Sequence, residues 1–400
     1  MSKNIIAPPV RFQGFTAPWR QRKLSEVTDR YDNLRVPVTA NLRIPGNTPY
    51  YGANGIQDYV DGYTHDGEFI LVAEDGAKDL SNYPINYVNG RIWVNNHAHV
   101  LQGKNHIASN KFLAYAMRKI DIKSVLVGGG RAKLNAEAMM KLGLQLPSYS
   151  EQAKIGQYFS NLDNLLTLHQ RKLELMKKLK AFFLKNMFPE EGEIVPRIRF
   201  KGFTGDWEQR KFGEIAEYKK GPFGSALKKD FFIPDSATSV KVYEQQNAIN
   251  KNWNLSRYYI SKEYAQKLKS FEVHAGDIIV SCAGTIGEIY ELPAQSRSGI
   301  INQALMRIRV NEDIVCKDIF KLAFSNMIDS FSREFSNGSA IKNIPPFADL
   351  KPMKILLPNK AEQTIIGDFF TDIDKTITLH QRKIDQLQAM KKFMLQNLFV

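Results

Sequence analysis

The sequence contains two copies of one long segment, and this repeat restricts the possible folds more than any other feature. Residues 151–188 align without a gap on residues 362–399, at an offset of 211, with identity at 17 of 38 positions. A shorter pair precedes them, RFQGFTAPWRQRKL at 11–24 and RFKGFTGDWEQRKF at 199–212, hereafter the opening motifs. A repeated order of motifs indicates tandem copies of one structural unit. We therefore predict two units, each made of an opening motif, a variable segment and the repeated segment.

Both repeated segments have the hydrophobic pattern of a long helix that pairs with another helix. Apolar side chains recur in alternating steps of four and three residues, which is the spacing of a coiled-coil seam. The seam positions are Ile155, Phe159, Leu162, Leu166, Leu173, Met176, Phe183 and Met187 in the first copy, and Ile366, Phe370, Ile373, Ile377, Ile384, Leu387, Met394 and Leu398 in the second. His169 and Lys180 interrupt the first seam, and His380 and Lys391 interrupt the second at the same places. At about 1.5 Å per residue, each segment forms a rod of roughly 57 Å, which is long enough to act as a spacer.

Each predicted helix begins with the same local signal. The pair Ser148 and Glu151 follows one proline, and the pair Asn359 and Glu362 follows another. This spacing is that of a capping box, in which the two side chains bond each other's backbone N–H groups. We therefore expect both glutamates to act locally at the helix start.

The variable segments combine short strand-like runs with one helix each. Runs such as EFILVAE, GRIWVNN, GDIIVSCAG and NQALMRIRV indicate strands, and helices are expected near 110–119 and 317–330. The predicted fold class is α+β. We place globular domains at 1–147 and 190–358, and the long helices at 148–189 and 359–400.

Charge and composition favour a polyanionic partner. The chain has 55 Lys and Arg against 41 Asp and Glu, a formal net charge of +14. Counterion release would then favour nucleic acid, although proteins that are simply basic share this excess. No run approaches the roughly 18 apolar residues of a membrane span and no apolar signal segment opens the sequence, so we expect a cytoplasmic location without membrane contact. Cys282 and Cys316 are too few for a disulfide framework or a zinc site, and we expect both to be reduced and buried or inert.

Catalytic motifs are missing from the sequence, although three segments imitate functional sites. The sequence has no phosphate loop of the GxxxxGK[ST] type, no HExxH, no CxxC and no GxSxG. Asn343–Phe347 (NIPPF) is similar to the tetrad that holds a flipped adenine in amino-methyltransferases, but its isoleucine puts the amide out of register, so a rigid turn is expected. His97, His99 and His106 lack a metal-ligand partner at fixed spacing, so we predict polar strand and loop residues and no metal site. Gly128–Arg131 is consistent both with a phosphate-binding backbone and with a flexible turn.

Several loops carry side chains that are able to bond base edges. Asn, Gln, Arg, Lys and Glu supply the donors and acceptors, and glycines permit close backbone approach. The candidates in the first domain are Asn54, Gly55, Glu74, Asp75, Asn95, Asn96, His97 and Arg131. Those in the second domain are Lys219, Lys220, Phe223, Ser225, Gln245, Gln246 and Asn247.

The whole layout closely resembles the specificity subunit of type I restriction–modification systems. The resemblance lies in the order RFxGFTxxWxxRKL, variable unit, Leu-Pro step and EQxxIGxFFxxxDxxxxLHQRK, followed by the same again. It implies that the variable units are target recognition domains, each reading half of a bipartite, asymmetric DNA sequence. It also implies that the two helices pack antiparallel, fix the gap between the half-sites and bind two N6-adenine methyltransferase subunits, which an ATP-dependent endonuclease and translocase subunit joins.

The resemblance further implies that this chain is not an enzyme and holds no cofactor. S-adenosylmethionine, ATP and Mg²⁺ are then expected on the partner subunits alone. The candidates for the helix-pair and partner interface are the seam residues from Ile155 to Met176 and from Ile366 to Leu387, together with His169, Arg171, His380 and Arg382. Two rival interpretations are a fused DNA methyltransferase or nuclease, which the missing motifs oppose, and a coiled-coil scaffold without a DNA role.

Antiparallel pairing of a repeated helix predicts a pseudo-twofold, circular arrangement. The end of the second helix, Phe399, should lie beside the first opening motif, as Phe188 lies beside the second. His169 and His380 occupy the midpoints of the repeated segments, so they should face each other, with at least one ring neutral and with Gln170 and Gln381 as further partners. The alternative is that each histidine is a partly exposed residue without a joint role.

Overall fold

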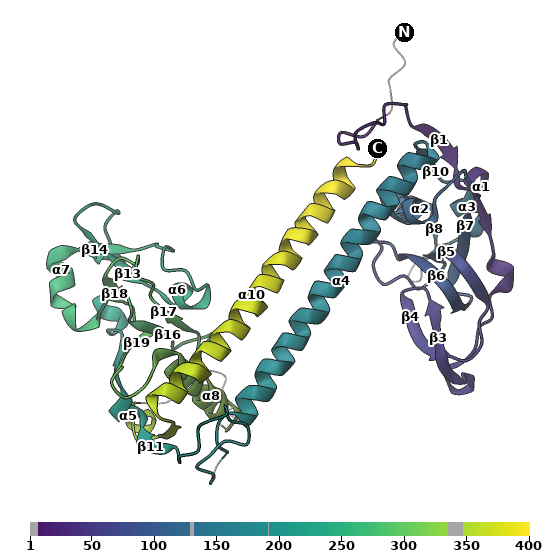
Figure 1. Ribbon diagram of the computed structural model, residues 1–400. Helices are drawn as coiled ribbons and strands as arrows, with labels where there is room; N and C mark the ends of the chain where they lie inside the picture. The colour runs from purple at the N-terminus through teal and green to yellow at the C-terminus, as the bar shows by residue number, and fades with distance from the viewer. Residues whose placement is uncertain (1–6, 129–131, 191, 335–346) are drawn as a thin grey trace. The chain divides into compact units, whose positions relative to one another are not determined.

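Two long helices are the main elements of the computed structural model. The structure describes residues 7–128, 132–190, 192–334 and 347–400. Helix α4 spans Tyr149–Asn186 and helix α10 spans Lys360–Asn397, 38 residues each, so both helices expected from the repeat are confirmed (Figure 1). Each begins and ends two residues before the repeated segment does. No helix among the described residues is long and apolar enough to cross a membrane.

The chain forms two compact units, and each long helix contributes one half to each unit. Unit 1 contains the residues up to 174 together with 379–400, and unit 2 contains residues 175–378. Each unit therefore combines one globular domain with two helix halves. The predicted mixture of helix and sheet is confirmed in both domains.

The domain of unit 1 is built on one six-stranded sheet. Its strands lie in the order β2 (Thr28–Arg30), β7 (Ala98–Gly103), β5 (His65–Ala73), β6 (Ile85–Val94), β3 (Pro45–Gly52) and β4 (Gly55–Val60). All neighbours are antiparallel except β3 and β6. Alternate apolar residues, among them Phe69, Leu71, Val88 and Val100, form its core. Helix α2 (Asn110–Ala116) contacts β5 and β6 with a buried apolar face.

The domain of unit 2 contains two four-stranded sheets instead. One has the order β12 (Ala216–Lys220), β19 (Leu305–Val310), β16 (Ile278–Ser281) and β17 (Ile289–Glu291). The other has the order β14 (Tyr259–Ser261), β13 (Ser239–Tyr243), β18 (Gly299–Ile301) and β15 (Glu272–Val273). Helix α8 (Lys317–Glu334) supplies Phe320 and Phe324 to the core. The two variable segments thus differ in sheet architecture as well as in sequence.

The same short strand pair closes each domain at the start of its long helix. In unit 1, β1 (Arg20–Lys23), which ends the opening motif, is antiparallel to β10 (Gly143–Leu146), which leads into α4. In unit 2, β11 (Glu208–Lys211) pairs with β20 (Lys354–Leu357) before α10 in the same way. Both ends of each domain are therefore held at one helix N-terminus.

The glutamates in the first turns bind the opening motifs. The expectation that these side chains cap the backbone N–H groups of Ser148 and Asn359 is therefore wrong. The Ser148 hydroxyl and the Asn359 side chain do accept the N–H of Glu151 and Glu362, at 3.4 and 3.0 Å. The carboxylate of Glu151 instead receives two hydrogen bonds of 2.7 Å from the Arg11 guanidinium. Glu362 receives 2.6 and 2.7 Å bonds from Arg199. Both carboxylates are almost fully buried, so their charge requires this bidentate partner.

The glutamine after each glutamate ties the domain helix to the long helix. Gln152 accepts the N–H of Ser109, directly before α2, at 3.0 Å, and donates to two carbonyls. Gln363 accepts the N–H of Cys316, directly before α8, at 2.8 Å, and also donates to two carbonyls. Both glutamines are buried, and each satisfies its side-chain oxygen and nitrogen with these three hydrogen bonds. The repeated Glu-Gln pair is thus a junction between three segments of each unit.

A glycine in each long helix lets the domain helix approach closely. A Cβ on Gly156 would lie 2.8 Å from the backbone nitrogen of Phe112 in α2. A Cβ on Gly367 would lie 3.1 Å from the Cβ of Asp318 in α8. The contact is therefore tighter in unit 1, where backbone is the obstacle.

The ends of the repeated segments lie where the circular arrangement requires. The N–H of Val10 donates to the Asn397 carbonyl at 2.9 Å in unit 1, and the N–H of Ile198 donates to the Asn186 carbonyl at 2.8 Å in unit 2. Trp19 meets Phe399 at 6.4 Å between ring centroids, and the equivalent Trp207 meets Phe188 at 5.8 Å. The second helix therefore ends beside the first opening motif, as expected.

Candidate nucleic-acid interface

The halves of α4 and α10 pair antiparallel within each unit. In unit 1, Asp163 is bound to Lys391 while the later His169 meets the earlier His380. In unit 2, Lys180 donates to both oxygens of Asp374, at 2.6 and 2.8 Å. The two seam lysines thus have an aspartate of the opposite helix as partner, which satisfies their charge beside an apolar seam.

The predicted seam residues are distributed between buried and half-buried positions. The buried ones are Ile155, Phe159, Leu162, Leu166, Leu173, Met187, Ile366, Phe370, Ile384, Leu387 and Leu398, and the half-buried ones are Met176, Phe183, Ile373, Ile377 and Met394. Arg171 and Arg382 are exposed. The two arginines are therefore accessible to a partner, whereas most seam residues are covered by the chain itself.

The two midpoint histidines meet, as the repeat predicts. Their Nδ1 atoms are 2.9 Å apart and their ring centroids 5.1 Å apart. Since one Nδ1 must accept the hydrogen bond, at least one ring is neutral in this arrangement. Desolvation, followed by the neighbouring His380 and Lys172, lowers the pKa of His169 below its ordinary value. Both rings are half-buried rather than enclosed, and Gln381 donates to Asp385 instead of joining the pair, so that part of the expectation is wrong.

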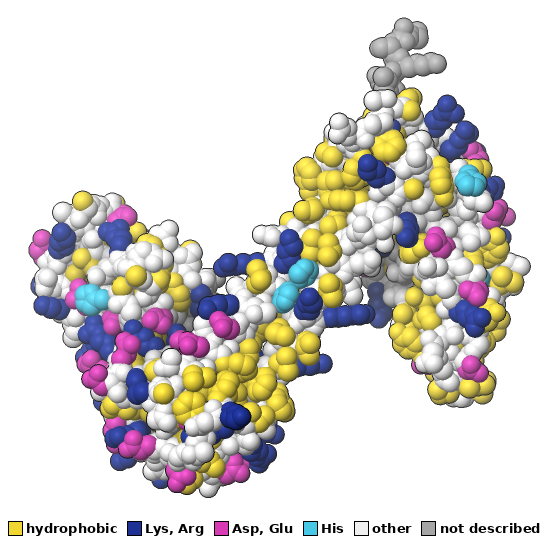
Figure 2. Space-filling view, in the orientation of Figure 1, with side chains coloured by type: hydrophobic (Ala, Val, Ile, Leu, Met, Phe, Trp, Pro, Cys, Tyr) yellow, Lys and Arg dark blue, Asp and Glu magenta, His cyan; other side chains and the backbone are white. Residues whose placement is uncertain are grey.

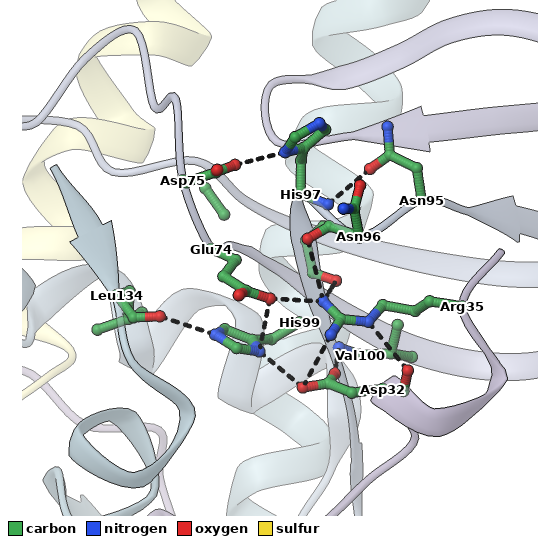
Figure 3. A network of polar contacts seen from close by, with 12 residues as sticks. Asp32, Arg35, Glu74, Asp75, Asn95, Asn96, His97, His99, Val100 and Leu134 are labelled. Atoms are coloured by element: carbon green, nitrogen blue, oxygen red, sulfur yellow. Dashed lines mark hydrogen bonds and ion pairs between the residues drawn. The ribbon is translucent and has the colours of Figure 1, made fainter. Parts of the chain in front are cut away.

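Three candidate loops of the first domain converge on one another. The Asn54 side chain bonds backbone groups of Gly76 and Lys78, both at 2.9 Å. In the next loop, His97 Nδ1 lies 2.5 Å from the Asp75 carboxylate, and the two side chains point toward each other in Figure 3. Asn95 accepts the N–H of His97 at 2.8 Å. The loops around 54, 75 and 96 are thus adjacent: the Asn54 amide joins two of them, whereas the Asn95 side-chain oxygen stabilises its own loop.

The Glu74 carboxylate belongs to an ion-pair network beneath these loops (Figure 3). It accepts a 2.7 Å hydrogen bond from Arg35 and lies 3.0 Å from Lys133. Burial alone would raise its pKa, but the bonds from Arg35 and Lys133 outweigh burial and lower it. The neighbouring His99 is buried between Asp32, at 2.7 Å, and the carbonyl of Leu134, at 2.9 Å. Glu74 is therefore a charged structural group.

The remaining first-domain candidates differ in exposure. Asn96 is exposed, and the side chain of His97 is partly exposed. Gly55 has φ +111°, so glycine is required there by the turn between β3 and β4. Arg131, with most of the Gly128–Arg131 segment, lies outside the described residues, as does Asn343–Pro346. Within the described ranges, no group of three His, Cys, Asp or Glu is placed to hold a metal ion.

The second domain contains a groove of about 720 Å³ with a mixed polar and apolar lining. Residues of the segments 242–250, 255–258 and 302–304 line it together with Leu227 and Phe232, and its polar side chains include Gln245, Gln246, Asn250, Arg257, Asn302 and Gln303. The Oε1 atom of Gln245 is buried and has no hydrogen-bond partner within the described residues, so this acceptor is unsatisfied. Amide side chains of this kind read adenine and other base edges through paired donors and acceptors.

Asn247, a further candidate, lies beneath the groove and stabilises it. Its Oδ1 accepts the N–H of Glu244 at 2.8 Å, and its Nδ2 donates to the carbonyls of Leu255 and Asn252 at 2.6 and 3.0 Å. The residue is buried. On the rim, Glu244 binds the exposed Arg257 at 2.7 Å, and this hydrogen bond raises the pKa of Arg257. Arg257 is thus a permanently charged group held in position at the groove.

The loop 219–225 packs against one wall of this groove. The N–H of Gly221 donates to the Leu305 carbonyl at 2.9 Å, and a Cβ on Gly221 would lie 1.9 Å from the Asn302 carbonyl oxygen. A Cβ on Gly224 would lie 3.7 Å from the Nε2 of Gln303, which lines the groove. The two predicted second-domain loops are therefore brought together by the turn at 302–304. Lys220, Phe223 and Ser225 are exposed, and Lys219 is half-buried.

Sequence reasoning missed several polar residues of these surfaces. Arg35 organises the first-domain loops, whereas Asn250, Arg257, Asn302 and Gln303 line the groove. The run NQALMRIRV held a signal, because two amides stand before its apolar residues, but the prediction assigned both to a strand. The structure places Asn302 and Gln303 in the turn before β19.

The two cysteines differ in burial. Cys282 is buried, as expected, whereas Cys316 is half-buried. Burial raises the pKa of the Cys282 thiol to about 12, so it stays protonated near neutral pH.

A protein-family profile and two relatives relate this chain to the specificity subunits of type I restriction systems. The profile of the type I restriction modification DNA specificity domain matches twice, over residues 17–178 and 204–389. A putative type I restriction enzyme specificity subunit of Haemophilus influenzae is 34% identical over 69% of this chain and 68% of the relative. The specificity subunit of the type I restriction enzyme MjaVIII from Methanocaldococcus jannaschii is 22% identical over 73% of this chain and 70% of the relative.

A solved structure shares the fold over nearly the full length. The type I restriction–modification S subunit from M. genitalium aligns over 99% of both chains with a TM-score of 0.69 at 13% identity. Both profile matches begin within an opening motif and extend into a long helix, so they coincide with the two repeats. The chain belongs to the type I restriction–modification specificity family and is the non-catalytic subunit that confers DNA sequence specificity.

Proposed function

We propose that the two globular domains read the two halves of a bipartite, asymmetric DNA target, and that the helix pair sets the gap between them. The observation that carries this proposal is that one set of anchoring contacts recurs in both units around two different sheet architectures. The same anchoring contacts around two dissimilar domains suit two domains that recognise different DNA sequences independently. Two half-sites that must occur at one distance and helical phase give more specificity than either alone.

In the second domain, the groove supplies the side chains for direct readout. Gln245, Gln246 and Gln303 offer amides for base edges, and Arg257 offers a guanidinium for guanine or phosphate. The exposed Lys220, together with the net charge of +14, supports phosphate contacts that set the register. In the first domain, the exposed Asn96 and the partly exposed His97 remain the candidates for base contacts.

The long helices are the proposed docking site for two N6-adenine methyltransferase subunits. Hydrophobic side chains stay exposed on them at equivalent repeat positions: Leu168 and Leu379 are 46% and 65% exposed, and Phe182 and Phe393 are 52% and 54% exposed. Figure 2 shows hydrophobic side chains, in yellow, on the surface of the long helices. Exposed apolar side chains on paired, charged helices suit a protein interface. Equivalent positions on the two helices would suit two copies of one partner.

The remaining partners and the location follow from this role. An ATP-dependent endonuclease and translocase subunit would join the methyltransferase core. We place S-adenosylmethionine, ATP and Mg²⁺ on those subunits and adenine flipping on the methyltransferase, so this chain would select the base without reacting with it. We propose the cytoplasm as its location, because cellular DNA is the molecule that it would bind.

Binding of the assembled complex to defined duplexes tests this function. Methylome sequencing of a host that carries the system first identifies the target. Affinity is then measured for the intact site, for each half-site scrambled in turn, and for a gap changed by one base pair, which moves the half-sites by about 3.4 Å and a tenth of a turn. Each change should weaken binding at least about 100-fold. Equal affinity after one half is scrambled, or after the gap is changed, would overturn the proposal.

A further inference from the structure

Among the large apolar side chains that the structure describes, Phe223 stands apart by its exposure. It is 88% exposed, compared with 70% for Leu42 and 68% for Ile44. Single exposed apolar residues are common on protein surfaces, so exposure by itself assigns no role. The local backbone and the surrounding charges give it one.

The backbone holds the Phe223 ring away from the domain. Its φ and ψ are −58° and 148°, next to Pro222, whose ring restricts the chain. The Phe223 carbonyl accepts the N–H of Ala226 at 2.8 Å, which closes a short turn. On the other side, Gly221 is packed so closely against Asn302 that a side chain has no room. The loop is therefore fixed at both ends, and the ring is presented to solvent.

The surroundings of the ring suit a nucleic acid. Gly224 lies close to the Gln303 side chain, and both Gln303 and Leu227 line the groove. Phe223 is therefore next to the groove in the chain and in space. The segment 219–230 has four lysines, Lys219, Lys220, Lys228 and Lys229, against one acidic residue, Asp230. A protein partner for an apolar anchor would be expected at a rim of mixed charge, whereas phosphates favour a cationic one.

We infer that Phe223 inserts between base pairs of the half-site that the second domain reads. The inference rests on the proposed function of that domain. Apolar wedges of this kind partly unstack one base step and kink the duplex, and the contact of the ring with base faces repays part of the cost. Phe223 then adds shape and deformability readout at one step, next to the amides that read base edges in the groove.

The test uses the complete complex and duplexes with 2-aminopurine at successive positions of this half-site. Wild-type complex should increase the fluorescence at one step beside the bases read by the groove, because insertion unstacks the probe. Phe223→Ala should lose that signal and bind about 5- to 150-fold more weakly, with Phe223→Leu between the two. The signal from the adenine flipped by the methyltransferase should persist in both variants.

Phe231→Ala is the matched control in the same domain. Phe231 already stacks on Tyr264, at 4.4 Å between centroids, so its removal should leave the 2-aminopurine pattern unchanged. A salt titration adds a second readout: Phe223→Ala should keep the wild-type slope, whereas Lys220→Ala should reduce it by about one.

The two levels of the proposal fail differently. If the wild-type complex binds duplexes with an intact and with a scrambled half-site equally tightly, the proposed function itself is wrong. If wild-type complex is specific but Phe223→Ala binds with equal affinity and an unchanged fluorescence pattern, the wedge is wrong. Loss of the methyltransferase subunits from the Phe223→Ala complex would also overturn the wedge, because it would assign the ring to a protein interface.

Discussion

The two units of this chain are alike in how they are held and different in what they present. Each has an arginine of the opening motif bound to a buried helix glutamate, a glutamine at the domain helix and an aromatic contact at the helix end. Within that shared support, unit 1 has one six-stranded sheet and unit 2 has two four-stranded sheets. The contrast indicates that the anchoring contacts and the reading surfaces vary independently.

The shared support is nevertheless unequal in detail. Asp163 in unit 1 receives both Lys391 and the hydroxyl of Tyr115, at 2.6 Å from the latter. Its counterpart Asp374 is bound by Lys180. The glycine contact is also tighter in unit 1. Variants at equivalent positions therefore separate what the units share from what they do not.

Removal of the arginine anchors should have the largest effect, and an equal one in both units. Arg11→Ala and Arg199→Ala each leave a buried carboxylate without its partner, which should cost about 3–5 kcal/mol in the affected unit. Hydrogen exchange by mass spectrometry measures the loss unit by unit. Arg22→Ala, which breaks an exposed pair with Glu26, is the control and should cost less than about 1 kcal/mol.

A neutral partner should rescue these variants. Glu151→Gln combined with Arg11→Ala should recover part of the lost stability, because a buried amide needs less compensation than a buried carboxylate. Unequal losses for Arg11→Ala and Arg199→Ala would show that the two anchors are not equivalent.

Replacement by alanine of the glycines at which the long helices contact the domain helices, Gly156 and Gly367, should reduce the stability of the two units unequally. Gly156→Ala places a methyl 2.8 Å from backbone and should cost about 1–3 kcal/mol. Gly367→Ala meets a side-chain Cβ at 3.1 Å, and its better helix propensity offsets the strain, so the change should be within about 1 kcal/mol. Thermal unfolding of the two variants measures the difference, and equal costs would contradict the unequal contacts.

These contrasts also explain which features were predictable from the sequence. The helices, their seam and the meeting of His169 with His380 follow from periodicity and from a fixed repeat offset. The partner of Glu151 does not, because Arg11 lies 140 positions away while the local spacing to Ser148 imitates a capping box.

The candidate site was predictable to a smaller extent. Asn54 and Asn247 were selected because asparagine reads bases, but asparagine also stabilises turns, and the structure uses both in that way. Arg257 and Gln303 were missed because the groove is formed by segments far apart in the chain. Only tertiary packing distinguishes an amide that holds a loop from one that faces a ligand.

Tyr115→Phe should have a smaller effect, confined to unit 1. The variant loses the hydrogen bond to Asp163 while Lys391 stays bound, so about 0.5–1.5 kcal/mol of stability should be lost. Hydrogen exchange should show the change near α2 and not in unit 2. An equal loss of protection in both units would contradict a contact that belongs to one of them.

The midpoint histidines should give the smallest effect, seen as a dependence on pH. The folded state lowers the pKa of His169, so the unfolded chain binds more protons and stability decreases as the pH falls through about 6.5 and below. The double variant His169→Leu with His380→Leu should lack this loss and be at least as stable at pH 7. Since the rings are half-buried, the difference between wild type and variant should change by less than about 1 kcal/mol between pH 7.5 and 5.5. A difference that is independent of pH would exclude the interaction.

The most direct measurement is methylome sequencing of a host in which residues 20–146 are exchanged for the equivalent segment of a relative. The exchanged segment starts after Trp19 and ends before α4, so the Arg11–Glu151 pair, the Trp19–Phe399 contact and all of unit 2 keep their own residues, while the segment of the relative supplies the partner of Gln152. We expect one half of the methylated target to change while the other half and the gap between them stay the same. A change in both halves or in the gap would contradict independent reading by two domains on one shared support.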